Sequence, residues 1–253
     1  MRIHRCSQRY FGVEQLDQRL RHGLVGYWKF NEGSGLTAQD LSGKRNHGTL
    51  INGPKWSLGR EHIGNALSFD GVDDYVDCGN DVSLDIGGED FTLEFWGKFE
   101  PDAKSENDVI SNGTGTNGNW LLMVYNKKLR GHLWTSDGGS NVINSTINVD
   151  DGLWHQFLQV VSSDQIILYI DGVENNRQTL TASKVSLQQT VFIGSRSGTT
   201  TFAKGLIDEV RIYNRALSPA EIVLFASPSF SPVVPVRRHI EEVITHIRGW
   251  WSK

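Results

Sequence analysis

In residues 90–100, DFTLEFWGKFE, an apolar residue or glycine recurs at every second position. Every second side chain in this stretch lies on one face of an extended chain, and these residues are Phe91, Leu93, Phe95, Gly97 and Phe99. Alternation of this kind is typical of a β-strand that buries one face. The stretch therefore predicts a strand that packs its aromatic side against a second layer.

Similar short aromatic and β-branched segments lie on both sides of this stretch. They include LVGYWKF (24–30), ALSFDG (66–71), DYVDC (74–78), WLLMVYN (120–126), LRGHLW (129–134), HQFLQVV (155–161), QIILYID (165–171), VFIGS (191–195) and GLIDEVRIY (205–213). Asn-Gly and Asp-Gly pairs, which tolerate the positive φ of tight hairpins, stand between them at 52–53, 70–71, 112–113, 137–138, 151–152 and 171–172. The pattern predicts an all-β protein, either a sandwich or a barrel.

The two ends of the chain differ from this central part. Residues 1–22 form a basic arm with five arginines against two acids, and residues 228–253 carry four basic side chains against two acidic ones. The formal net charge is −4, so the body between the ends is acidic. We expect three parts: an N-terminal arm (1–22), a β-sandwich (23–226), and a linker with a C-terminal helix (227–253).

Helical patterns appear close to the C-terminus. Ser218 can cap a helix that has Pro219 in its first turn and Glu221 three residues after the cap. A proline-containing linker (227–235) follows. Beyond the linker, apolar residues recur at helical spacing and predict an amphipathic helix: Val236, Ile240, Val243, Ile244, Ile247 and Trp251.

Cysteine content and apolar runs limit the possible cellular context. Cys6 and Cys78 do not make a disulfide framework, so we expect free thiols. No run is long enough to predict a membrane-spanning helix. The N-terminus has no apolar core before a small-residue cleavage site, so we expect no signal peptide.

Three blocks, in this order, resemble the laminin-G-like domains of the concanavalin A-like lectin/glucanase superfamily. The first comprises GLVGYWKFNEGSG (23–35), LSGKRNHGTLINGPKW (41–56) and ALSFDGVDDYVDCG (66–79). The second contains DGLWHQFLQVV and IILYIDGV (within 151–173), and the third is GLIDEVRIYNRALSPAEI (205–222). The resemblance covers about residues 23–226. It implies a jelly roll of two curved antiparallel sheets, with the first and last strands adjacent.

Some members of this superfamily hydrolyse glycosides. Such enzymes hold two carboxyl groups on either side of the scissile bond, about 5–5.5 Å apart in the retaining class. The sequence has no Glu-x-Asp-x-x-Glu or Glu-x-Asp-x-Glu run, and Glu94 has no neighbouring acid on its own face of the strand. We therefore expect a binding protein and not an enzyme.

The resemblance also implies a structural calcium ion between the first and last strands. Calcium takes carboxylate and carbonyl oxygens as ligands. Matching motifs offer the Asp208 side chain, the Asn31–Glu32 turn, and backbone carbonyls near Asp70 and Gly71. The alternative is that Asp208 only accepts hydrogen bonds from turn amides.

Two polar loops are candidates for a glycan site. Sugars stack on aromatic rings, while amides and carboxylates bind the hydroxyl groups. The loops NGTGTNGNW (112–120) and SDGGSN (136–141), with the adjoining strand end, offer Asn112, Asn117, Asn119, Trp120, Trp134, Asp137 and Asn141. The alternative is that these are ordinary polar turns.

Two functions fit these features. The first is a phage or virus-particle surface protein, for capsid decoration or host attachment, which binds capsid or other particle proteins through residues 1–22 and 228–253 within a larger assembly. The alternative is an extracellular or cell-surface carbohydrate-binding lectin module. The C-terminal helix favours docking to protein over membrane contact, since Glu241 and Glu242 weaken attraction to anionic lipid. The acidic body does not favour nucleic acid.

Overall fold

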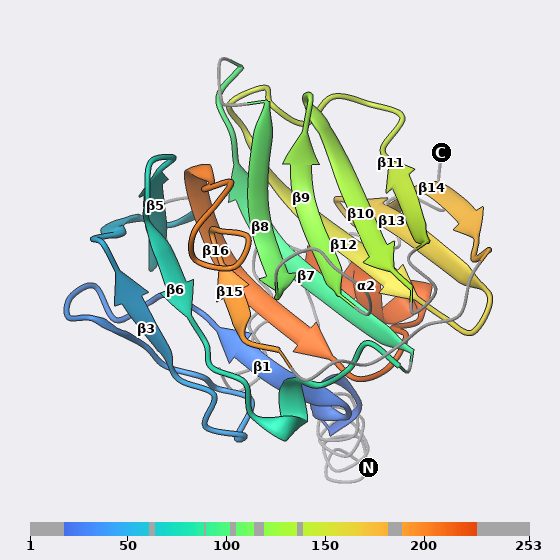
Figure 1. Ribbon diagram of the computed structural model, residues 1–253, viewed down its shortest axis with the longest axis horizontal. Coiled ribbons are helices and arrows are strands. Elements are labelled where there is room, and N and C mark those ends of the chain that lie inside the picture. Colours follow the sequence, from blue (N-terminus) through green and yellow to red (C-terminus); the bar gives the residue numbers. More distant parts are fainter. Residues whose placement is uncertain are drawn as a thin grey trace, which may run out of the picture.

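The computed structural model describes residues 18–60, 64–88, 90–101, 105–113, 119–135, 139–181 and 189–226 (Figure 1). Two eight-stranded antiparallel sheets lie face to face, which confirms the predicted concanavalin A-like sandwich. The predicted linker and C-terminal helix lie outside the described residues, as do residues 1–17 of the arm. No described helix is long and apolar enough to cross a membrane.

The back sheet in Figure 1 is built around the last long strand of the chain. Its order is β14 (Val173–Thr179), β13 (Gln165–Ile170), β12 (Trp154–Val161), β7 (Phe91–Lys98), β16 (Lys204–Tyr213), β5 (Asn65–Asp70) and β4 (Lys55–Leu58), with β1 (Leu24–Trp28) also paired to β16. The first and last strands are therefore adjacent, with Trp28 opposite Val210.

The front sheet faces the viewer in Figure 1. Its order is β11 (Ser140–Asn144), β10 (Lys128–Trp134), β9 (Trp120–Tyr125), β8 (Glu106–Asn112), β15 (Val191–Ile193), β6 (Tyr75–Asp77), β3 (Gly48–Ile51) and β2 (Thr37–Ala38). A single 3₁₀ turn, η2 (Val82–Leu84), follows β6. Its N-terminus is capped by the carboxylate of Asp81, which accepts from the Ser83 amide.

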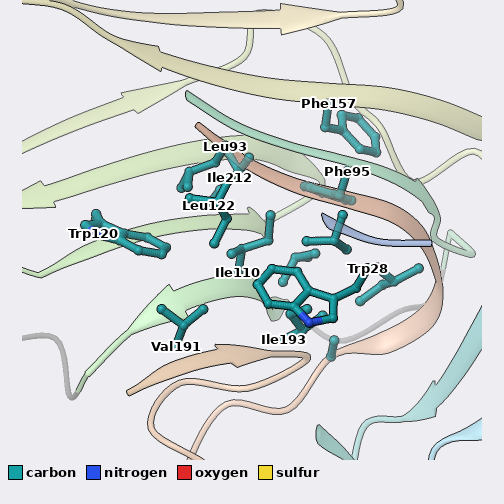
Figure 2. Packing of buried hydrophobic residues seen from close by; sticks show 14 of the residues in the cluster. Trp28, Leu93, Phe95, Ile110, Trp120, Leu122, Phe157, Val191, Ile193 and Ile212 are labelled. Atoms are coloured by element: carbon teal, nitrogen blue, oxygen red, sulfur yellow. The ribbon is translucent and has the colours of Figure 1, made fainter. Parts of the chain in front are cut away.

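The main core fills the space between the two sheets (Figure 2). Phe91, Leu93, Phe95 and Phe99 all belong to it, so the alternation in residues 90–100 is confirmed. Gly97 lies on the same face, where an added Cβ would come within 2.6 Å of the Phe99 ring. The neighbouring rings fill the space that a side chain at this position would need.

A second apolar cluster covers the outer face of the back sheet. Helix α2 (Pro219–Ala226) packs Ile222 and Phe225 against β12, β13 and β16, and in Figure 1 it lies behind the sheets. Its start has the predicted capping box, because the Ser218 amide donates to Glu221 Oε2 over 2.9 Å.

The last residues of the predicted arm also pack on this cluster. Leu20 is buried in it, and Arg215 donates to the carbonyl oxygens of Arg19 and His22 over 2.9 Å and 2.7 Å. Residues 18–22 therefore join the domain. In the main core, Cys78 is a buried free thiol whose pKa is raised by burial, whereas Cys6 lies outside the described residues.

Candidate functional site

The outer face of the front sheet presents polar and aromatic side chains. On β10 the side chains of Leu129 and Leu133 face the core, and the buried Gly131 lies between them on the same side of the strand. The alternate residues point outward and are all half-buried: Lys128, Arg130, His132 and Trp134. We define the candidate face as these four residues together with the outward side chains of β8, β9 and β11 beside them.

Trp134 and His132 form a stacked pair on the candidate face, at the end of β10. Their ring centroids are 3.5 Å apart and their planes differ by 18°. Burial, together with the smaller effect of the Arg196 and Arg130 charges, lowers the pKa of His132 to about 4. The imidazole is therefore neutral at pH 7, and it stacks on the indole as an uncharged ring.

Strand β9 supplies the floor beside this pair. Leu121 lies opposite His132 and Met123 lies opposite Arg130; both are buried although they point away from the core. Arg130 lies over the Tyr125 ring, with Cζ 3.7 Å from the centroid, and its Nε donates to Asn144 Oδ1 over 2.8 Å. This apolar floor is buried beneath the outward side chains of β10, and Arg130 is held in place above it.

A loop after β15, residues 194–203, packs over β8 at the far side of the face. Arg196 Nε lies 2.8 Å from Asp108 Oδ2, and its Nη2 donates to Glu106 Oε1 over 2.9 Å. Thr201 Oγ1 donates to Asp108 Oδ2 over 2.6 Å. Burial raises the pKa of Asp108 to about 6, although Arg196 opposes the shift. Arg196 lies 5.9 Å from the Trp134 ring, so the loop borders the aromatic pair.

The structure brings the described members of the predicted glycan set to one corner, where β8 and β10 end and β9 and β11 begin. Asn112 Oδ1 accepts from the Trp120 amide over 2.6 Å, and the Trp134 amide donates to the Asn119 carbonyl over 2.9 Å. Asn141 lies opposite Leu133. Asn117 and Asp137 lie outside the described residues.

Among the described residues of the predicted glycan set, only Trp134 reaches the outer face. The Trp120 ring is fully buried in the core (Figure 2). Asn112, Asn119 and Asn141 are each at most 3% exposed, and Asn141 Oδ1 accepts from the amide and hydroxyl of Thr181. The side-chain amides of Asn112 and Asn141 thus support the corner from within, whereas Asn119 contributes its backbone carbonyl.

Several residues of the candidate face were not predicted from the sequence. The alternation in KLRGHLW (128–134) already puts Arg130 and His132 on the same side as Trp134, so this signal was present. Arg196 carries no such signal, because its partner Asp108 is 88 residues away along the chain.

The residues predicted to bind calcium do not meet at one point. Asn31 lies at the start of β5, where its Oδ1 accepts from the Asn65 amide over 2.7 Å, and Glu32 Oε1 accepts from the Gln39 amide over 2.7 Å. Asp70 and Gly71 lie at the other end of β5, which is about 17 Å away for a strand of this length.

Asp208 lies at a third position, opposite Trp96 of β7. Its Oδ1 accepts from the amide of Glu209, the next residue in β16, over 2.8 Å. Burial and the adjacent Glu209 carboxylate raise the pKa of Asp208 to about 8.

A different group of acids forms at the turn after β5. Carboxylate oxygens of Asp70, Asp73 and Asp74 lie within 4.8 Å of one another. Burial raises the pKa of Asp74, which also accepts from the Asp70 amide over 3.0 Å. An all-oxygen set of this kind suits a hard divalent cation, so the group could hold a metal ion.

Comparison with known families agrees with this architecture. The model of a laminin G family, described as concanavalin A-like lectin/glucanases superfamily, matches residues 70–223, more than half of the chain. The chain belongs to this superfamily. A search of curated proteins found no significant match.

Solved structures with the same fold include toxin binding domains and an enzyme-associated domain. The binding domain of Paraclostridial Mosquitocidal Protein 1 superposes with a TM-score of 0.70 at 16% identity, covering 82% of this chain and 52% of that one. The receptor binding domain of botulinum neurotoxin D superposes with a TM-score of 0.64 at 16% identity, and the match covers 82% of this chain and 53% of that one. This chain thus spans about half the length of these toxin domains.

Domain 4 of AbnA, an extracellular arabinanase of Geobacillus stearothermophilus, was solved in complex with arabinotriose. It gives a TM-score of 0.65 at 18% identity, and the match covers 81% of this chain and 98% of that domain. Identities this low establish a shared fold only. These neighbours are binding domains, and they give no support to the predicted role on a virus particle. The carbohydrate-binding alternative has the better support.

Proposed function

We propose that this protein is a carbohydrate-binding module that holds an oligosaccharide on the outer face of the front sheet. The observation that carries the proposal is the half-exposed Trp134–His132 stack, 3.5 Å between centroids, on the outer face of the front sheet. Flat aromatic surfaces with an apolar face and a few fixed polar groups suit the C–H faces and hydroxyl groups of a sugar.

The polar groups around the stack provide the hydrogen bonds. Arg130 is held by Tyr125 and Asn144, so it presents its remaining N–H groups from a fixed position. Ser140 pairs with Trp134 across β10 and β11 and is exposed. The arabinotriose complex of the AbnA domain, which has the same fold, supports an oligosaccharide as the ligand class. We place the module outside the cell or at a cell surface.

The described carboxylates do not favour hydrolysis as the function. Glu106 and Asp108 on the candidate face are both paired with Arg196. On the back sheet, Glu94 and Glu209 are buried and paired with Arg211. A glycosidase needs one carboxyl group to donate a proton and a second to attack or to activate water, both next to the sugar. We therefore propose binding without catalysis.

We also propose that Asp70, Asp73 and Asp74 bind calcium in a structural role. The three carboxylates lie in one turn between β5 and β6, and they supply only oxygen donors. An ion there would fix the connection between the two sheets.

A glycan array tests the binding function. The full chain is applied to arrays that contain arabino-oligosaccharides and sialylated glycans, beside Trp134→Ala and Trp154→Ala variants. Trp154 is a matched control, because it is also half-buried but begins β12 in the other sheet. We expect binding that is about tenfold weaker or worse in Trp134→Ala and unchanged in Trp154→Ala. A wild-type chain that binds no glycan, or equal loss in both variants, would rule the proposal out.

A further inference from the structure

The outward side of helix α2 is apolar throughout. Its buried residues, Glu221, Ile222 and Phe225, face the back sheet, and Glu221 is held by Arg215. The residues that are not buried carry no polar side chain: Pro219, Ala220, Val223, Leu224 and Ala226. A helix on the surface of a protein normally presents polar or charged residues to water, whereas a helix that is apolar on all sides is normally covered.

The apolar surface continues from α2 onto the turn between β13 and β14. A Cβ added at Gly172 would lie 2.9 Å from the Ala226 Cβ and 3.4 Å from the Val223 Cα, so this turn packs directly on α2. Next to it, Val173 is 60% exposed, and Val223 itself is 47% exposed. We call this the α2 face, defined by Ala220, Val223, Leu224, Ala226 and Val173.

We propose that residues 236–251 of the same chain fold back as an amphipathic helix and cover the α2 face. The apolar row of this segment supplies the matching surface: Val236, Ile240, Val243, Ile244, Ile247 and Trp251. Its charged residues Arg238 and Glu242 fall on the opposite side of such a helix and remain in water.

The length of the connection fits this arrangement. The linker, residues 227–235, starts directly after α2 and contains three prolines. In extended form it reaches about 28 Å, at about 3.1 Å per residue. Helix α2 is about 12 Å long and a helix over residues 236–251 about 24 Å. The segment can therefore reverse direction and lie along α2 and the adjoining turn.

Disulfide trapping in the full chain tests the contact. In a Cys6→Ser background, Val223→Cys is combined with Val243→Cys on the apolar row. The matched control combines Val223→Cys with Thr245→Cys, two residues away and therefore on the opposite side of the helix. A disulfide needs Cα atoms about 4.4–6.8 Å apart. We expect oxidation to give a monomeric disulfide in the first variant at least about tenfold faster than in the control, independent of protein concentration.

The disulfide experiment gives a different result if something other than residues 236–251 covers the α2 face. A disulfide that forms only between chains and scales with concentration assigns the α2 face to a second copy and overturns the proposal. Equal trapping at both positions, or none at either, also overturns it.

Trypsin cleavage provides a second readout that does not depend on engineered thiols. Val223→Asp places a charge in the α2 face without changing a core residue. The control, Val82→Asp, places a charge on η2, outside the α2 face, at a valine that is 72% exposed. We expect cleavage after Arg237, Arg238 and Arg248 to become about tenfold faster in Val223→Asp only. Equal rates in the two variants would contradict the proposal.

Discussion

The imidazole of His132 stacks on the indole of Trp134, with 3.5 Å between ring centroids and planes inclined by 18°. Both residues project from β10 to the outer face of the front sheet, while α2 occupies the outer face of the back sheet. One face of the sandwich is thus closed by the chain's own helix, and the other presents an aromatic pair edged by Arg130 and Arg196.

The half-buried His132 makes stability depend on pH. Its pKa in the folded protein is about 4, below the ordinary 6.5, so between these values the unfolded chain binds more protons. Folding stability should therefore fall as the pH decreases from about 6.5 to 4, and it should be constant with respect to this group above 6.5. Because the ring is partly exposed, we expect a loss of only about 1–2 kcal/mol.

Urea unfolding at pH 7.0 and 4.5 measures this effect, with His132→Phe as the comparison. Phenylalanine keeps a ring beside Trp134 but does not titrate. We expect the variant to lose about 1–2 kcal/mol less than the wild type between the two pH values. An identical pH dependence in both proteins would show that His132 is not the group responsible.

The ion cluster under α2 should be essential for stability. Arg211 is 2% exposed and pairs with Glu94 and Glu209, and its Nη2 also donates to the Tyr27 hydroxyl over 3.0 Å. Arg211→Met would leave Glu94 buried without a counter-charge. We expect a loss of about 3–5 kcal/mol in the free energy of unfolding, measured by urea denaturation.

The control for this experiment is Arg177→Met, which breaks a solvent-exposed pair with Glu174. Because such pairs contribute little, its denaturation midpoint should equal that of the wild type. Similar midpoints for the two variants would contradict the structural role given to Arg211.

Calcium should stabilise the fold through the turn after β5. With calcium at about 100 times its dissociation constant, the free energy of unfolding should rise by about 2.7 kcal/mol. The increase in melting temperature should disappear on adding a chelator and in Asp73→Asn, but it should persist in Asp164→Asn, an exposed acid in another turn. No calcium-dependent shift in the wild type would remove the metal proposal.

The sequence predicted the two layers of the fold, but it did not predict for every strand which side chains face outward. Alternation in β7 fixed the core positions Phe91 to Phe99. In β9, by contrast, Leu121 and Met123 are as buried as the core residues Trp120 and Leu122, because His132, Arg130 and the loop after β15 cover them. A strand that is apolar on both faces carries no signal of its orientation. For this reason Trp120 could not be distinguished from Trp134 as a ligand residue.

Long-range pairing limited the rest of the site prediction. Arg196 reaches Asp108 only because β15 lies beside β8 in the folded sheet. The calcium set illustrates the same limit, since Asn31 lies beside the first residue of β5 whereas Asp70 is its last residue. Contacts of this type depend on strand order, which local spacing does not contain.

The most direct test of the binding account is a titration of the ¹⁵N-labelled full chain with arabinotriose and with a sialylated oligosaccharide, followed by NMR. We predict saturable shifts of the Trp134 indole N–H, the Arg130 Nε–H and the backbone amides of β10 and β11, with Trp154 unchanged. Saturable shifts that map instead to the back sheet, with the Trp134 signal unmoved, would contradict the account.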